Sequence, residues 1–213
     1  MFRRLSQRPL LRRLMLLAPM AVIAALVLSA CAAFGQIGGD INRALNGVPA
    51  TMSTYTQFGD KIDQVHGVSI QVSRDDRFDS VNEKGGSNAD SSVLLISVGQ
   101  NSHVSHVGST MVIAQEGLTS ISDSVSPKVS VTNNQPGTPW LNNIFEKNRN
   151  LWKGKSKTIM IRSQSGLPVA VYAGNAVEAF ATDVPKSTAF RVDGLYLFVY
   201  RADYTVFDND LLL

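Results

Sequence analysis

Cysteine is nearly absent from this sequence: Cys31 is the only one in 213 residues. One thiol excludes an internal disulfide framework and any metal centre that needs several cysteines. Histidine is almost as scarce, with three in the chain, and the glycine-rich loops that bind nucleotides are missing. The sequence therefore predicts no cofactor, and the fold must depend on its hydrophobic core.

Acidic residues are missing from the first 30 positions, which carry five arginines. All five precede residue 14, and residues 14–30 have no charge. A basic start, an apolar stretch and small residues at its end are typical of a secretory signal peptide. A helix over the apolar stretch would rise about 25 Å, short of a hydrocarbon core of about 30 Å. We expect residues 1–30 to be a signal peptide; the alternative is an uncleaved N-terminal anchor helix.

The end of this segment, Leu28-Ser29-Ala30-Cys31, resembles the lipobox of bacterial lipoproteins. The resemblance implies that the Cys31 thiol receives a diacylglyceryl group and that the chain is cut just before it. Two acyl chains are enough for a stable anchor, whereas one is marginal. The resemblance thus implies a lipid bilayer as partner and a place on the extracytoplasmic face of the bacterial cell membrane.

A short flexible tether is expected at residues 31–39, which contain three glycines. Its reach is at most about 28 Å, so the following domain should lie close to the membrane. We expect residues 40–213 to form one extracytoplasmic domain. From Cys31 onward the chain has 15 basic and 17 acidic residues, a net charge of −2, so no global basic field favours nucleic acid.

Helical signals come first in this domain. Asp40 can cap a short helix to residue 45, with Gly47 as its stop. A second helix is predicted over residues 49–66, because apolar residues recur there at three- and four-residue spacing. These residues are Met52, Tyr55, Phe58, Ile62 and Val65.

Strand signals follow. Residues 68–72 alternate between apolar and polar, residues 74–91 form a polar loop, and Asp193-Gly194 is typical of a tight hairpin turn. The predicted strands are residues 93–98, 104–114, 158–162, 169–172, 189–192 and 195–200, with additional short ones at 118–121, 128–131 and 205–207. Residues 93–98 and 195–200 should be central strands. The fold class is therefore α+β: a mainly antiparallel β-sheet, as a sandwich or a highly curved sheet, with two or three amphipathic helices.

Candidate chemical groups are few. In a strand, the three-residue spacing of His103 and His106 puts them on opposite faces, which does not suit a shared metal. Together with Asp90 or Asp123 they could serve a serine hydrolase, but no Gly-x-Ser-x-Gly elbow is present. Two acidic pairs, Asp75-Asp76 and Asp208/Asp210, lack the glycine and later glutamate of a calcium loop. The sequence predicts no catalytic residue and no metal ligand.

A further amphipathic helix is predicted over residues 138–153, between Thr138 as cap and Gly154 as stop. Its apolar side chains fall within an arc of about 140°. They are Trp140, Leu141, Ile144, Phe145, Leu151 and Trp152. The helix either packs on the sheet or faces the membrane surface, which two tryptophans and a basic flank would suit.

The segment Ile41-Asn42-Arg43-Ala44-Leu45-Asn46-Gly47, followed by residues 55–66, resembles uncharacterised bacterial lipoproteins, mainly from Gram-positive organisms. That family has no assigned activity, so the resemblance implies no site. We expect a non-enzymatic surface lipoprotein that binds a partner protein, an envelope polymer or a small ligand. The alternative is an extracytoplasmic envelope hydrolase.

Overall fold

The computed structural model describes residues 41–124 and 140–212. All of them belong to one compact unit, Gly38–Leu213, and the other unit, Met1–Ile37, lies outside the described residues. The predicted signal peptide, the whole tether with Cys31 and the expected strand at residues 128–131 therefore stay predictions.

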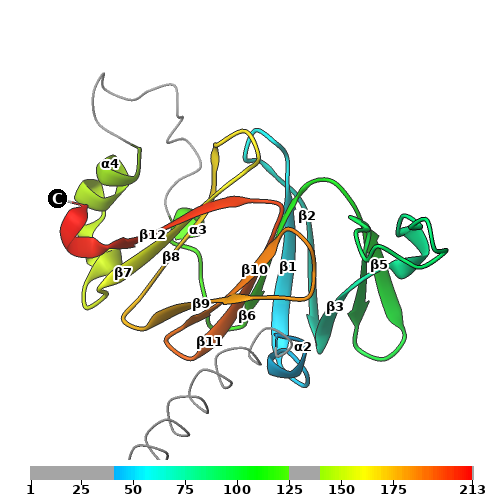
Figure 1. Cartoon of the computed structure of the whole chain (residues 1–213). Helices are drawn as coiled ribbons and strands as arrows, with labels where there is room; N and C mark the ends of the chain where they lie inside the picture. Colours follow the sequence, from blue (N-terminus) through cyan, green and yellow to red (C-terminus); the bar gives the residue numbers. More distant parts are fainter. Residues whose placement is uncertain (1–40, 125–139, 213) are drawn as a thin grey trace, which may run out of the picture. The chain divides into compact units, whose positions relative to one another are not determined.

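A six-stranded antiparallel sheet forms the centre of the described unit, with the strands in the order β2-β1-β6-β11-β10-β9 (Figure 1). The strand bounds are β1 Pro49–Tyr55, β2 Lys61–Val68, β6 Thr110–Gln115, β9 Val177–Ala181, β10 Ser187–Val192 and β11 Leu195–Tyr200. The sheet thus combines three separate parts of the chain. β6 and β11, both rich in apolar residues, lie at its centre.

The other described strands form two three-stranded antiparallel sheets, in the orders β3-β4-β5 and β12-β7-β8. Their bounds are β3 Ile70–Arg74, β4 Leu94–Val98, β5 Ser102–His106, β7 Lys157–Arg162, β8 Pro168–Gly174 and β12 Asp203–Asp208. Figure 1 shows them on opposite sides of the six-stranded sheet.

The central sheet buries side chains on both faces, because successive residues of a strand point in opposite directions. Phe198 of β11 packs in one core with Ile70 and Ile96 of the β3-β4-β5 sheet. Its neighbour Leu197 packs in a second core with Ile159 of β7. This two-sided burial explains why residues 195–200 are continuously apolar. The predicted antiparallel, sandwich-like arrangement is confirmed.

Helices are few and short in residues 41–124 and 140–212, which corrects the expected two or three amphipathic helices. The α-helices are α2 Ile41–Ala44, α3 Ile121–Ser124 and α4 Trp140–Lys147, and the 3-10 turns are η1 Asp76–Phe78, η3 Arg149–Trp152 and η4 Asn209–Leu211. Side chains of α3, α4 and η3 pack in a third core with Met160 and Val171 of β7 and β8. Within residues 41–124 and 140–212, none of the helices is long and apolar enough to cross a membrane.

The predicted helix over residues 49–66 is wrong: β1 and β2 form a hairpin there. Spacing of three residues puts side chains on one face of a helix but on opposite faces of a strand. Met52 and Tyr55 accordingly lie in different cores. Phe58 is in the turn between the strands, where Gly59 has a φ of +91°, and its side chain is exposed. The β-branched and aromatic residues of this segment favour strands.

Other boundaries also differ. The strand expected at residues 104–114 is two strands, β5 and β6, separated at Gly108, whose φ is +98°. Residues 118–121 are no strand, since Ile121 begins α3. Strand β9 had not been predicted. The Asp193-Gly194 hairpin is confirmed, with φ values of +49° and +89°.

The predicted helix over residues 138–153 exists as α4 followed by η3. Its apolar side chains Leu141, Ile144, Phe145 and Trp152 are buried against the sheet, while Leu151 is partly exposed; the side chain of Trp140 is outside the described ones. These four buried side chains are not available to a membrane surface. The membrane-facing interpretation is therefore replaced by a helix docked on β7 and β8.

Candidate functional site

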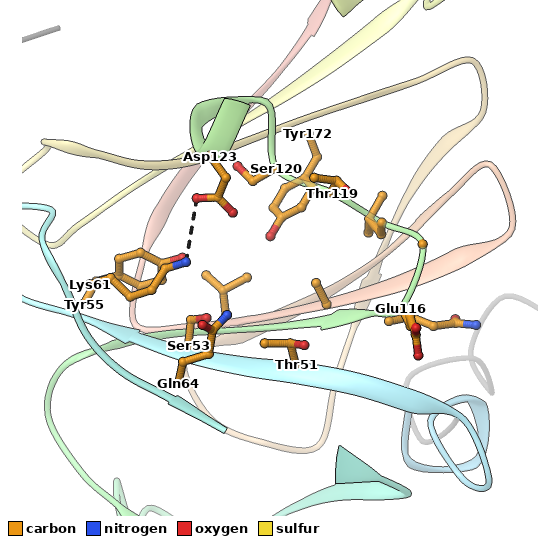
Figure 2. Close-up of a pocket in the computed structure, with 15 residues that line it drawn as sticks. Thr51, Ser53, Tyr55, Lys61, Gln64, Glu116, Thr119, Ser120, Asp123 and Tyr172 are labelled. Carbon is orange, nitrogen blue, oxygen red and sulfur yellow. Dashed lines mark ion pairs between the residues drawn. The ribbon is translucent and has the colours of Figure 1, made fainter. Parts of the chain in front are cut away.

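A polar cleft opens between the central sheet and Tyr172 of β8 (Figure 2). Its volume is about 210 Å³. Its lining comes from β1, β2, β6, β8, α3 and the connection from β6 to α3. The lining residues are Thr51, Ser53, Tyr55, Lys61, Gln64, Val112, Ala114, Gln115, Glu116, Gly117, Leu118, Thr119, Ser120, Asp123 and Tyr172.

The floor of the cleft is a set of polar side chains on β1. Thr51, Ser53 and Tyr55 are two residues apart, so the pleat directs all three to the same face. The intervening Met52 points into the core on the other face. Ser53 pairs in register with Gln64 of β2, which adds an amide to the same floor. The strand period thus produces a hydroxyl-rich surface from a segment that otherwise belongs to the core.

The opposite wall is fixed by Ser120. Its Oγ donates to the Val171 carbonyl oxygen over 3.2 Å and accepts from the Val171 N–H over 3.0 Å. These two bonds attach the connection after β6 to strand β8. Ser120 is buried, so its hydroxyl holds α3, and with it Asp123, above the floor. Figure 2 shows Asp123 and Tyr172 extending from this wall toward the floor residues.

One ion pair crosses the cleft. Lys61 Nζ lies 3.7 Å from Asp123 Oδ1, and the two side chains are 35% and 53% exposed. A separation of that length, between exposed groups, gives little stabilisation because water screens both charges. Each charged group therefore remains able to exchange its partner for a ligand atom.

The two tyrosines of the cleft are held in the neutral form. Burial raises the pKa of Tyr55 to about 12, the negative charge of Asp123 adds to the increase, and a hydrogen bond with Ser53 opposes it. Burial also raises the pKa of Tyr172, with contributions from Tyr55 and Asp123. At neutral pH both phenols can donate and accept hydrogen bonds. Figure 2 shows the Tyr172 hydroxyl directed into the cleft.

The cleft thus offers hydroxyls, amides and one weakly coupled pair of opposite charges. Its volume is smaller than the roughly 300–1,000 Å³ of pockets for drug-sized ligands. Within the described ranges, no group of three or more histidine, cysteine, aspartate or glutamate side chains could hold a metal ion. The arrangement suits recognition of a small ligand by directional hydrogen bonds.

The histidines lie outside the cleft lining. His103 and His106 are both on β5, where they contact Ser97 Oγ and the Ser109 carbonyl oxygen. His66, on β2, contacts the hydroxyl of the lining residue Thr51 over 3.1 Å. Of the residues considered for a hydrolase, only Asp123 lines the cleft.

Three of the acidic residues considered above form contacts with nearby side chains. Asp75 accepts from the Arg77 side chain over 2.6 Å and 2.8 Å, and Asp90 accepts from Ser80. Asp208 pairs with Lys157 over 2.5 Å. The sequence analysis predicted no site at the cleft. The sequence signal that could have indicated it is the two-residue spacing of Thr51, Ser53 and Tyr55, in a segment that was predicted to be a helix.

Comparison with known proteins identifies the family but no activity. A search of curated proteins and a search of solved structures each gave no significant match. A family model described as a domain of unknown function (DUF5052) matches residues 12–212. Its description does not mention lipoproteins, so the lipoprotein resemblance remains a prediction. Because the match covers nearly the whole sequence, this chain belongs to the DUF5052 family.

Proposed function

We propose that this protein is a lipid-anchored extracytoplasmic binding domain, and that the cleft between β1, β2 and β8 is its ligand site. The observation that carries the binding function is the convergence of Tyr55, Tyr172, Gln64 and the Lys61–Asp123 pair on one small cavity. A concave site with a few converging polar groups is the usual form of a small-molecule site.

The proposed anchor rests on the sequence. A basic start, an uncharged segment over residues 14–30 and a lone cysteine in the lipobox position together are characteristic of lipoprotein signals. The family model begins at residue 12 and continues through Cys31, which supports this segment as part of what family members share. Acylated Cys31 would keep the cleft near the envelope polymers that lie against the membrane.

The cleft chemistry favours a small ligand that is rich in hydroxyl or amide groups. Neutral phenols, hydroxyls and amides recognise such groups by paired donor and acceptor contacts. A cavity of about 210 Å³ suits one sugar ring or one or two amino acids. We therefore propose a sugar or peptide unit of an envelope polymer as the ligand, and soluble disaccharide-peptide fragments of peptidoglycan as the probe.

Binding is tested by titrating full-length protein in a neutral detergent with these fragments. Tyr172→Phe removes one hydroxyl from the cleft and should weaken binding about fivefold to tenfold, the effect of one neutral hydrogen bond. Asp123→Asn should weaken it as well. Tyr204→Phe and Asp210→Asn are the matched controls, because both residues are exposed and outside the cleft; they should bind like the wild type.

Equal affinity in the Tyr172 variant and its control would refute the assignment of the cleft. Mass analysis of the fragments after incubation separates binding from the alternative function. Intact fragments support a binding domain, whereas cleaved fragments would identify an envelope hydrolase instead.

Lipidation is tested separately. Intact-mass analysis of the membrane fraction should give a mature chain that starts at an acylated Cys31, and Cys31→Ala should abolish the added mass. A mature N-terminus elsewhere, without acyl mass, would refute the anchor and leave the cleft proposal intact.

A further inference from the structure

We propose a second binding site, for a singly charged oxyanion, at the end of the β10–β11 hairpin where Lys186 and Arg201 meet. Lys186 directly precedes β10 and Arg201 directly follows β11. The Arg201 N–H donates to the Lys186 carbonyl oxygen over 2.9 Å, so the two basic residues are neighbours although 15 positions separate them. Together they border a cavity of about 470 Å³.

The two cations have only neutral partners. Arg201 Nη2 donates to Gln164 Oε1 over 3.2 Å, and Lys186 Nζ donates to Ser92 Oγ over 3.0 Å. Among the described residues, neither forms an ion pair, whereas Lys155, Lys157 and Arg191 each do. Both residues border the same cavity, so an anion bound there would meet two cations that lack an acidic partner.

Arg201 also has an unused donor. In the described part of the chain, its Nε is the one buried side-chain nitrogen or oxygen without a hydrogen-bond partner. A buried donor that lacks an acceptor is unfavourable. An oxyanion in the cavity would give this guanidinium the acceptors it lacks, after a rotation of the guanidinium toward the opening. A guanidinium fork matches the oxygen pair of a carboxylate or phosphate.

The backbone supplies a further observation. Lys186 and Arg201 have φ values of +61° and +49°, in the left-handed region that such residues rarely adopt. Residues held in this conformation are frequent at ligand sites.

The charge balance indicates the ligand class. Asp203 also borders the cavity, so its carboxylate reduces the two positive charges to a net charge of +1. A monoanion such as a phosphodiester or a carboxylate would be neutralised there, whereas a dianion would be left with excess negative charge. The phosphodiester could belong to a soluble molecule or to a phospholipid headgroup.

The test observes Arg201 directly, by ¹⁵N NMR of arginine Nε–H groups in full-length protein in a nonionic detergent. The Arg201 signal is identified by its loss in Arg201→Asn. We expect dimethyl phosphate or acetate to shift this signal in a saturable way, and Lys186→Asn to weaken the apparent affinity at least fivefold. Asparagine tolerates the left-handed conformation, so both variants should fold.

Lys153→Asn is the matched control, since Lys153 is exposed and lies outside the cavity; it should leave the titration unchanged. Saturation by dimethyl phosphate in lipid-free detergent supports a soluble ligand. Saturation only after phosphatidylglycerol is mixed into the micelles supports a lipid headgroup. A non-saturating shift equal to that produced by sodium chloride, or an unchanged affinity in Lys186→Asn, would overturn the proposal. The site is separate from the cleft, so either can fail alone.

Discussion

Replacing Thr158 by valine should destabilise the fold strongly while keeping the volume of the side chain. Thr158, on β7, is fully buried. It accepts from Trp152 Nε1 over 2.8 Å and donates to Asn209 Oδ1 over 2.6 Å. Asn209 Nδ2 in turn donates to the Lys155 carbonyl oxygen over 2.8 Å. One hydroxyl therefore connects η3, β7 and η4.

The magnitude follows from the groups that lose their partner. Thr158→Val leaves the indole N–H of Trp152 and the amide oxygen of Asn209 buried without a hydrogen bond. Each such group costs about 1–3 kcal/mol, so the two together should cost about 2–6 kcal/mol. That is a large share of the roughly 5–15 kcal/mol that stabilises an ordinary domain.

Urea unfolding followed by circular dichroism measures this loss. Thr205→Val is the control: its hydroxyl accepts from Arg162 Nη2 over 2.6 Å, but at a half-buried position where water can replace it, so the cost should be below about 1 kcal/mol. In a Trp152→Phe background, Thr158→Val should cost less because no indole N–H is left unpaired. Equal losses in the Thr158 and Thr205 variants would refute the reasoning.

Three further predictions concern other parts of the fold. Gly67→Ala should destabilise the protein by about 1–3 kcal/mol, because the added Cβ would lie 2.3 Å from Val98 Cγ1. In urea unfolding, adding Val98→Ala to this variant should restore part of the lost stability. If the losses of the two single variants simply add in the double variant, the predicted contact is contradicted. Hydrogen exchange should place the β4 and β11 amides among the most protected, since β4 lies between β3 and β5 and β11 lies inside the six-stranded sheet; rapid exchange in both would contradict the topology. A hydrogen bond from Ser87, with further ones that include Arg74, lowers the pKa of Asp79. The ionised Asp79 carboxylate therefore stabilises the fold above the ordinary pKa of aspartate, and this stabilisation is lost as pH falls through the lowered pKa. The free energy of unfolding, measured from pH 6 to 2, should depend less on pH in Asp79→Asn than in the wild type.

Strands that consist of a continuous run of apolar residues could be predicted from the sequence. Residues 93–98 and 195–200 are continuous apolar runs, and the structure has β4 and β11 there with nearly the same bounds. The hairpin at Asp193-Gly194 was predictable because glycine and aspartate accept a positive φ. In these places local preference and tertiary packing agree.

The β1–β2 hairpin could not be predicted, because its apolar spacing fits a helix as well as a strand that is buried on both faces. Met52 and Tyr55 belong to different cores, and a single sequence does not show that two cores exist. The cleft was missed for the same reason. Its floor on β1 and its wall at Asp123 and Tyr172 are far apart in the sequence, and only the sheet order brings them together.

The position of β6 between β1 and β11 has a consequence for how the chain reaches its folded state. Ile113 of β6 pairs with Met52 on one side and with Phe198 on the other, 85 residues later. Strands that are far apart in the sequence pair slowly, because the chain must lose conformational entropy before the stabilising contacts form. Until β11 has been synthesised as far as residue 200, β6 keeps an unpaired, apolar edge. Until then the chain depends on protection of that edge against aggregation.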